Sequence, residues 1–326
     1  MNPTPGSVFI DPLLTNFSLA LMQKPGSFVA PLAFPVIPVS LQAGKYAVYP
    51  RGYFMRGTMK VRPLGDRPIQ IDYKIDYGSF YTDEYAAEKL VDDRVRANSM
   101  DPLGPDRGAT KLLTSNALVF RDRHWADTYF KAGVWTSNYA GVAAAPGVGQ
   151  FLRFDQAGSD PLGYIESLKE SMGSATGFEP NIIVLGRLVY GVLKEHPQVL
   201  DRIKYSQRGV VTVDLLAELF GVDKVVVAMS VQTTSAEGQT DTTGYIADPK
   251  SFWLGYATST PNLEEPTAGA TFAWTGLIPG LTNALGGVVE RGRAEREHSD
   301  WFHIRQAFGD AVVAPDLGIF AASAVS

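Results

Sequence analysis

The sequence predicts an α+β fold, and its 326 residues suggest about two domains. Three observations predict this class. A proline-interrupted apolar segment leads into two runs that alternate apolar and polar residues, a helical repeat covers residues 109–130, and residues 180–230 read as strand, helix, basic loop, helix and strand. Hydrophobic residues make up 45% and charged residues 19%, which is ordinary for a globular chain with a large core.

The composition excludes several classes of function. A net charge of -5 and a pI near 5.5 argue against a protein that grips nucleic acid through its phosphates, because such a grip requires a basic face. Cysteine is absent, which excludes disulfides, thiolate zinc sites and cysteine nucleophiles and fits synthesis in a reducing cytosol. The N-terminal residues lack the basic region of a secretory signal, and no apolar run is long enough to span a bilayer.

Residues 1–44 are predicted to form an extended arm. The stretch SFVAPLAFPVIPVSL is strongly apolar but is interrupted by Pro31, Pro35 and Pro38. Proline removes a backbone donor and fixes φ, so this stretch fits neither a helix interior nor a central strand. Few local partners exist for its apolar side chains Phe28, Phe34, Val36 and Val39. We therefore expect them to pack on another surface, either of the same chain or of a neighbouring copy.

The segment after residue 44 predicts a long β-hairpin. Apolar and polar residues alternate in it, with the apolar positions at Tyr46, Val48, Phe54, Met55, Ile69, Ile71, Tyr73 and Ile75. Residues 45–74 hold seven Lys or Arg and two Asp, a net charge of +5, whereas residues 76–106 hold eight Asp or Glu and three Lys or Arg, a net charge of -5. Two interpretations stay open: both segments are solvated, or the basic hairpin reaches an acidic region of a neighbouring subunit.

A strand through about Leu90 is expected to lead into a short helix, and a long helix is predicted over residues 109–130. The helical spacing predicts that Leu113, Ala117, Phe120 and His124 lie on one face of this helix. The same spacing turns three charged residues away from it, Arg121, Asp122 and Arg123.

Another helix is expected between the N-cap Asp160, which precedes Pro161, and Gly177. Its apolar stripe consists of Ile165, Leu168 and Met172. The C-terminal part reads as a meander of strands. In WFHIRQAF, alternation puts Phe302, Ile304 and Phe308 on one face and Trp301, His303 and Arg305 on the other.

No motif in the sequence assembles a catalytic, cofactor-binding or metal site, so none is predicted. The stretch PGVGQFLRFD lacks the third glycine of a dinucleotide loop, and no Walker lysine motif occurs. In GSATG, Ala175 stands where a nucleophile elbow requires serine.

Histidines and paired carboxylates have plainer interpretations. His124 favours a hydrogen-bonded packing role over that of a base, and His196 ends a helix, where the dipole favours the cation. The best metal candidates are Glu297, His298, Asp300 and His303. The two histidines are five residues apart across a turn, which points them to opposite faces and favours a charged β-turn. The adjacent pairs Asp92–Asp93 and Glu264–Glu265 favour surface charge or a helix start over an acid–base dyad.

Three stretches together resemble the major capsid proteins of tailed bacteriophages, most closely the lambda-type group: SFVAPLAFPVIPVSLQAGKYAVY, NIIVLGRLVYGVLKEHPQVLDRIKYSQRGVVTVDLLAELFGVDKVVVAMSVQTTSAEGQT and DAVVAPDLGIFAASAV. They span most of the chain in the order of the family, and the middle stretch is the most specific. The resemblance implies the Hong Kong 97-like phage capsid fold. That fold has an N-terminal arm, an E-loop hairpin, a P-domain with a spine helix, and an A-domain near the capsomer axis.

Carried onto this sequence, the resemblance implies an arm over residues 1–44, with Ser27 to Leu41 as its apolar part, and an E-loop hairpin over 45–82. It implies a P-domain over 83–177 with the spine helix at 107–132, an A-domain over 178–274, and returning P-domain strands over 275–326. The basic loop DRIKYSQRG, with Arg202, Lys204 and Arg208, would lie near the capsomer axis, or would be a plain solvated connection.

The implied function is that of a capsid subunit, not an enzyme, which assembles with itself through arm, hairpin and A-domain into pentamers and hexamers. The implied further partners are a portal, an optional decoration protein and double-stranded DNA held without sequence recognition. Some relatives carry a long N-terminal scaffolding segment, whereas this sequence begins almost at the arm, so a separate scaffolding protein is expected. The implied location is the virion, after assembly in the bacterial cytoplasm, with no membrane association.

Some relatives also join lysine to asparagine between subunits. Lys45, Lys60 and Lys74 lie in the hairpin, but no residue pattern specifies such a bond and none is predicted. Two alternatives to the capsid reading remain: an encapsulin-like compartment that shares the fold but encloses cargo enzymes, and an α/β enzyme built on residues 180–250, which lacks the motifs it would need.

Overall fold

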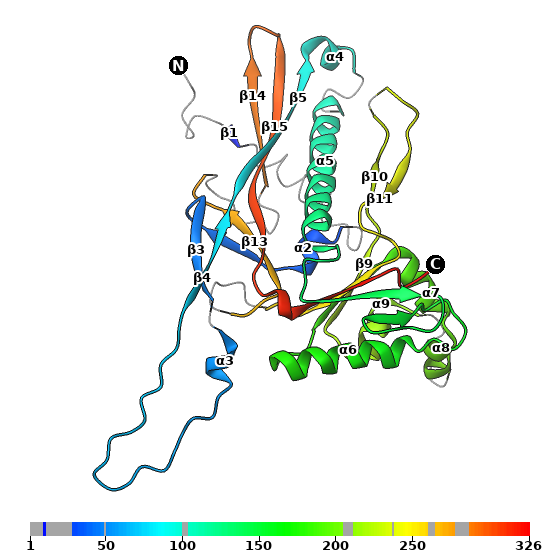
Figure 1. Ribbon diagram of the computed structural model, residues 1–326. Helices are drawn as coiled ribbons and strands as arrows, with labels where there is room; N and C mark the ends of the chain where they lie inside the picture. Colours follow the sequence, from blue (N-terminus) through cyan, green and yellow to red (C-terminus); the bar gives the residue numbers. More distant parts are fainter. Residues whose placement is uncertain are drawn as a thin grey trace.

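The computed structural model describes residues 9–10, 28–48, 50–99, 104–204, 211–236, 238–259, 265–277 and 287–326. Two six-stranded sheets and one long helix organise these residues. The long helix, α5 (Gly104–Tyr129), stands upright beside the first sheet, and its C-terminal end reaches the second sheet (Figure 1). Among the helices that are described, none combines the length and hydrophobicity that a membrane span requires.

The first sheet is built around one long strand. Its order is β1 (Phe9–Ile10), β14 (Gly287–Ala294), β15 (Ser299–Val312), β13 (Gly269–Trp274) and β2 (Val36–Val39). A sixth strand, β5 (Asp83–Asp92), pairs antiparallel with the first part of β15, while β13 pairs with its last part. The predicted alternation in WFHIRQAF is confirmed, because Phe302, Ile304 and Phe308 are buried whereas Trp301, His303 and Arg305 are only half-buried.

The second sheet contains the predicted strand–helix–helix–strand unit. Its order is β7 (Gln150–Leu152), β6 (Ser137–Val142), β16 (Gly318–Ala322), β12 (Phe252–Gly255), β8 (Ile182–Gly186) and β9 (Lys224–Ala228). Four helices belong to this half of the molecule: α6 (Pro161–Thr176), α7 (Arg187–Glu195), α8 (Pro197–Ile203) and α9 (Val213–Phe220). A single helix is expected between β8 and the basic loop, but Pro197 cannot continue α7 and starts α8 instead.

Opposite faces of the second sheet pack on different partners. Strand alternation sends Ile183 and Leu185 into a core shared with α6 to α9, and sends Val184 into a core shared with α2 (Ala30–Ala33) and the end of α5. The predicted caps of α6 are confirmed, since Asp160 accepts a hydrogen bond from the Gly163 N–H and Gly177 has a φ of 75°.

The structure corrects the predicted orientation of α5. Only Arg123 of the three charged residues is exposed; Arg121 and Asp122 are buried, whereas Phe120 is exposed. Part of the predicted apolar face is confirmed, because Leu113 and Ala117 pack against the first sheet. The reason for the error is that α5 is buried on a second side as well, so its apolar surface is wider than one stripe.

Several short elements lie outside the two large sheets. The strand β5 leads into α4 (Asp93–Ala97), as predicted from the strand signal that ends near Leu90. The strands β10 (Val231–Thr233) and β11 (Thr243–Tyr245) form a small hairpin beside α5 (Figure 1). A 3₁₀ turn, η2 (Pro315–Leu317), connects β15 to β16. The chain thus leaves the first sheet at β15 and ends in the second.

Candidate assembly surfaces

The predicted hairpin is paired only at its base. The strands β3 (Ala43–Val48) and β4 (Asp76–Tyr81) are antiparallel, and between them the chain forms only the short helix α3 (Arg51–Phe54) and an extended loop. The strand predicted from the alternation of Ile69, Ile71 and Tyr73 is therefore wrong, because residues 56–75 do not form a strand. Alternation alone cannot distinguish a paired strand from an extended segment that lacks a partner.

Stacked aromatic rings fix this base to the body of the molecule. The ring of Phe272, on β13, stacks on Phe80 with a centroid separation of 4.5 Å and on Tyr46 with a separation of 6.0 Å. All three side chains are buried. The direction in which the extended loop leaves the body is therefore set by a packed aromatic contact, although the loop itself packs against little.

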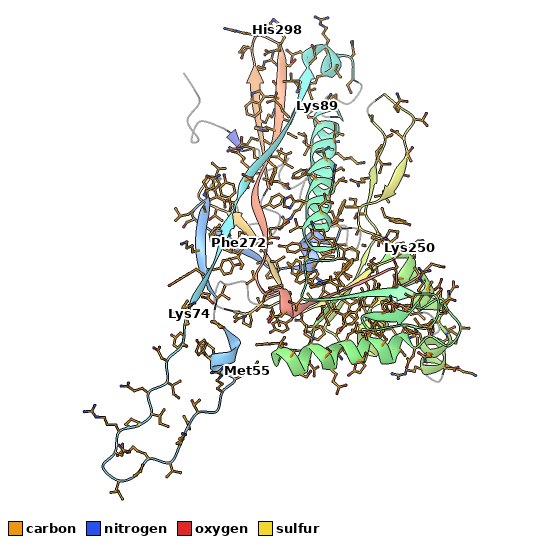
Figure 2. All side chains as sticks on the ribbon, in the orientation of Figure 1. Met55, Lys74, Lys89, Lys250, Phe272 and His298 are labelled. Carbon is orange, nitrogen blue, oxygen red and sulfur yellow. The ribbon has the colours of Figure 1, made fainter. Side chains whose placement is uncertain are left out.

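The loop carries apolar side chains that its own chain leaves in water. Figure 2 shows the side chains between Met55 and Lys74 projecting from an isolated ribbon. The most exposed are Met59 at 91%, Val61 at 97% and Leu64 at 107%. Soluble monomers rarely expose a contiguous group of this kind unless it is a contact surface. The loop is therefore the strongest candidate for a contact with another molecule.

The charges of the loop and of the following acidic stretch are only partly used inside the chain. Lys74 lies 3.5 Å from Asp76 in an exposed ion pair. In the acidic stretch, Glu84 pairs with Arg305 at 2.6 Å and Asp93 with Arg293 at 2.6 Å. These internal pairs reduce the negative charge that is open to a neighbour. The contacts within one chain therefore do not decide whether both segments are solvated or whether the basic hairpin reaches an acidic region of a neighbouring subunit.

The described part of the apolar arm packs on its own chain. Phe34 lies among aromatic rings, with its centroid 4.5 Å from that of Tyr129 and 5.1 Å from that of Trp253. Its strand β2 pairs in parallel with β13 at the edge of the first sheet, where Pro38 is tolerated. The sequence left open whether the arm packs on its own chain or on a neighbouring copy. Residues 28–39 pack on their own chain.

Asp122 holds three segments together. Its Oδ1 accepts hydrogen bonds from the backbone N–H groups of Val29 at 2.7 Å and Ala30 at 2.8 Å. Its Oδ2 accepts a hydrogen bond from the hydroxyl of Ser230, at the root of the β10–β11 hairpin. Burial raises the pKa of the Asp122 carboxyl, and the three donors counteract this rise. The carboxylate thereby caps the first turn of α2 across a long sequence separation.

Sequence reasoning missed Asp122, although a weak signal exists. Thr114, Leu118 and Trp125 are buried on the same side of α5, at spacings of four, four and three residues that include position 122. This second stripe indicates that position 122 faces inward. A buried aspartate within an apolar stripe then predicts backbone donors nearby, but not which segment provides them.

A cavity of about 530 Å³ lies where the hairpin joins the body. Its lining comes from the hairpin, the β15–η2 connection and the end of α6, and it includes Val48, Phe54, Met55, Phe178, Pro266 and Val313. Two carboxylate residues, Glu265 and Asp316, complete the lining. Among the residues whose side chains are described, the lining contains no histidine, lysine or arginine. These residues therefore provide a mainly apolar surface at the root of the loop and do not form an acid–base pair.

The buried serine–histidine pair has the wrong proton arrangement for catalysis. The Nδ1 atom of His196 accepts the Gln198 N–H at 3.3 Å, and its Nε2 atom lies 3.1 Å from the Ser159 hydroxyl, which donates to the Phe154 carbonyl. The ring therefore donates to the serine and cannot act as its base. Burial lowers the pKa of His196, so the predicted preference for the cation is wrong.

The other candidate residues have structural roles. His124 donates a hydrogen bond from Nδ1 to the Asp310 carboxylate at 2.9 Å, which confirms the predicted packing role. His298 has a φ of 44° in the turn between β14 and β15, so the charged-turn interpretation is confirmed. Asp92 caps α4 by accepting the Arg94 N–H. Glu265 accepts a hydrogen bond from Thr258, while its neighbour Glu264 and the loop residue Arg208 lie outside the described residues.

An ion-pair network holds the tip of the first sheet together. Asp300, one of the four candidate metal ligands, forms ion pairs with Arg291 at 2.8 Å, Arg96 at 3.1 Å and Arg293 at 3.1 Å. Arg96 also pairs with Asp106 at the start of α5 at 2.8 Å. Three cations around one carboxylate repel a metal ion. In the described part of the chain, no group of three or more His, Asp or Glu side chains is placed to hold one.

Comparison with known sequences gives two long matches. No family model matches the chain. The sequence is 32% identical over 237 residues to the major capsid protein of Burkholderia phage BcepMu, a stretch that covers 72% of this chain and 74% of that protein. It is 22% identical over 321 residues to the major capsid protein of Pseudomonas phage JBD67, which covers 97% of each.

Solved structures share the fold. A phage-related protein from Bordetella bronchiseptica RB50 superposes with a TM-score of 0.71 at 21% identity, covering 97% of this chain and 98% of that one. The capsid of cyanophage P-SCSP1u gives 0.59 at 12% identity, with 92% and 89% covered. The SrpI encapsulin complex of Synechococcus elongatus PCC 7942 gives 0.52 at 9% identity, with 89% and 85% covered.

Proposed function

This chain belongs to the major capsid proteins of tailed bacteriophages, and we propose that its copies join into pentamers and hexamers by exchanging extended segments. It has the Hong Kong 97-like fold and forms the icosahedral head, so it is a structural component of the virion and not an enzyme. The assignment to the lambda-type group stays a prediction. Heterologous contacts that close into rings build such a shell from a single kind of subunit.

The observation that carries the proposal is the loop of residues 50–75. It leaves the body from a rigid aromatic base, exposes Met59, Val61 and Leu64, and has little of its own chain to cover them. A neighbouring copy would bury these side chains without either copy needing a larger core. Many such contacts in one shell act together, so each can be weak on its own.

The domain limits stay proposals, and the sheets suggest a refinement of them. The limits inferred from the sequence are 45–82 for the E-loop, 83–177 and 275–326 for the P-domain, and 178–274 for the A-domain. The second sheet contains β6 and β7 as well as β16, whereas β13 belongs to the first sheet. We therefore propose an A-domain of about residues 133–259 together with 315–326, and a P-domain built on α5 and the first sheet.

A hairpin replacement tests the proposal. Residues 51–74 are replaced by a short Gly–Ser turn that joins β3 to β4 and keeps Tyr46 and Phe80. We expect the variant to fold with nearly unchanged far-ultraviolet circular dichroism but to form no particles in electron microscopy, whereas the unmodified chain, expressed with its proposed scaffolding protein, forms closed shells. Shells of normal size from the shortened chain would refute the role of the loop.

The remaining partners are proposed from family membership. We propose a separate scaffolding protein and a portal, with a decoration protein as an optional addition, and assembly in the host cytoplasm. For packaged double-stranded DNA we propose weak, sequence-independent contact, because the net charge is -5. Binding of isolated subunits to duplex DNA at micromolar or tighter affinity in physiological salt would contradict this. For covalent crosslinks, an undivided monomer band from purified particles on a denaturing gel is expected.

The encapsulin-like alternative shares the fold but has no further support. The similarity to the SrpI encapsulin complex is 9% in sequence, which is informative about the fold only. Nucleic acid content separates the two functions: phage-infected cells should yield particles filled with DNA, whereas a cargo compartment would enclose protein.

A further inference from the structure

The cavity at the root of the hairpin has two walls that belong to different parts of the fold. One wall comes from the hairpin itself, with Val48 on β3, Phe54 on α3 and Met55 directly after α3. The facing wall comes from the body, with Phe178 after α6 and Val313 after β15. Its volume of about 530 Å³ falls within the range of about 300–1,000 Å³ that is usual for small-molecule sites. A ligand of that size would therefore touch both walls.

The hairpin wall keeps apolar surface in contact with water. Phe54 is 63% exposed and Met55 is 55% exposed. The ring of Phe54 lies 5.5 Å from that of Tyr73, on the returning part of the loop. The methyl group of Met55 reaches the body at the end of α6, 3.5 Å from the position that a Cβ atom of Gly177 would occupy (Figure 2). Because a ligand between the walls would remove this exposed surface from water, the hydrophobic effect favours one with an apolar body.

Two carboxylates give the cavity a preference for one sign of charge. Glu265 lies in the segment before β13, and Asp316 lies in η2. The hydroxyl of Thr258 donates a hydrogen bond to Glu265, which orients that carboxylate. The described side chains of the lining provide no cation to balance the two charges. Both carboxylates are exposed, so they contribute more to the choice between a cationic and an anionic ligand than to affinity.

We propose that this cavity is a binding site for a small amphipathic cation, an alkyl or aryl ammonium compound. The apolar body of the ligand lies between Phe54 and Phe178, and its charged head lies near Glu265 and Asp316. Sites for small ligands commonly have this composition, with apolar walls and a few polar groups that fix the orientation. The bound ligand restrains the root of the loop against the body. All of these residues belong to one chain, so the site goes beyond the capsid function and does not depend on it.

A set of related probes separates the effect of the apolar body from that of the charge. Dissociated subunits are titrated with decyltrimethylammonium below its micelle concentration. The comparison ligands are decyl sulfate, which has the same alkyl chain and the opposite charge, and tetramethylammonium, which has the charge without the chain. Binding is followed by the methyl NMR signal of Met55, assigned with Met55→Leu, and the signal of Met172 in the core beside α6 is the control.

We expect saturable shifts at Met55 and none at Met172. The affinity for decyltrimethylammonium should be at least about tenfold higher than that for either comparison ligand. A Met55 signal that does not respond would show that the cavity stays empty. An equal affinity for decyl sulfate would show a site without a charge preference. Either result overturns the proposal and leaves the capsid function as it is.

Charge variants test the two carboxylates. The double variant Glu265→Gln and Asp316→Asn keeps the shape of the lining, so it should bind decyltrimethylammonium several-fold more weakly but decyl sulfate at least as well. The matched control is Glu170→Gln with Asp241→Asn, two exposed carboxylates outside the lining, and its affinity should not change. Equal weakening in both double variants would mean that only the net charge matters, which contradicts the site.

Hydrogen exchange tests the restraint of the loop root. At saturation with decyltrimethylammonium, exchange of residues 50–55 should slow in the unmodified subunit, whereas exchange of the β10–β11 hairpin should stay the same. Phe54→Ala removes an exposed ring from the hairpin wall, so the subunit should stay folded while the affinity falls. Exchange at the loop root that is unchanged at saturation would show that the ligand does not join the two walls, and would overturn the proposal.

Discussion

The carboxylate of Asp122 accepts a hydrogen bond from the backbone N–H of Val29, a residue 93 positions earlier in the chain, at 2.7 Å. Together with the bonds from Ala30 and Ser230, this contact joins the arm and the root of the β10–β11 hairpin to the long helix. The charge is buried, but both of its oxygens accept hydrogen bonds. Removal of the carboxylate therefore leaves several buried donors without a partner, which is more costly than the net gain of the bonds themselves.

Substitution of this aspartate should weaken the whole subunit. For Asp122→Ala we expect the free energy of unfolding to fall by about 3 kcal/mol, because two buried N–H groups lose their acceptor. The matched control is Asp127→Ala, whose side chain on the same helix is 75% exposed, with an expected change within about 0.5 kcal/mol. Urea denaturation of dissociated subunits measures both. Equal losses in the two variants would contradict the capping role.

The contact between His124 and Asp310 should make stability depend on pH. The hydrogen bond to Asp310 raises the pKa of His124 above its ordinary value of 6.5, and the nearby charges of Asp127 and Asp83 act in the same direction. Its contribution is therefore fully present below pH 6.5 and is lost as the pH rises through the raised value. The stability lost in His124→Gln should be larger at pH 5.5 than at about pH 9. His303→Gln, on the other face of β15, is the control.

His196 should act in the opposite sense. Burial lowers its pKa, so the neutral ring is favoured in the folded state, and its contribution is present above pH 6.5 and is lost as the pH falls through the lowered value. His196→Asn keeps a side-chain acceptor at the start of α8 but cannot titrate. Between about pH 7 and 5, the unmodified chain should lose stability relative to this variant. A parallel decline of both chains would show that the buried ring does not contribute.

The aromatic base of the hairpin should couple the body to the extended loop. Phe272→Ala removes the ring that stacks on Phe80 and Tyr46 and should cost about 4 kcal/mol through the cavity it leaves. Phe272→Leu refills much of that volume and should cost clearly less. Hydrogen exchange of β3 and β4 in subunits stabilised by an osmolyte should increase more in the alanine variant. Unchanged exchange there would mean that the base is fixed by other contacts.

Several elements follow from local sequence signals and were predicted correctly. The helix α6 has its caps at Asp160 and Gly177, and the alternation around Phe302 and Ile304 matches the buried face of β15. Such signals are local, because caps and strand periodicity depend on a few adjacent residues. The missing catalytic motifs also pointed correctly to a structural protein, which the capsid relatives then established.

The features that sequence reasoning missed depend on distant partners. The inward orientation of Asp122 depends on the arm, the unpaired state of residues 56–75 depends on the lack of a facing strand, and the placement of β16 depends on the topology of both sheets. No local pattern encodes these relationships, so they emerge only once the tertiary structure is known.

The place of β16 in the second sheet has a consequence for how each subunit is made. This strand, which follows all others along the sequence, lies between β6 and β12 and hydrogen-bonds to both. Until the ribosome has produced residues 318–322, no strand lies between β6 and β12, and the hydrogen bonds that β16 makes to both cannot form. We therefore expect a chain that stops before β16 to leave this sheet open, so that shortened products are poor building blocks for a growing head.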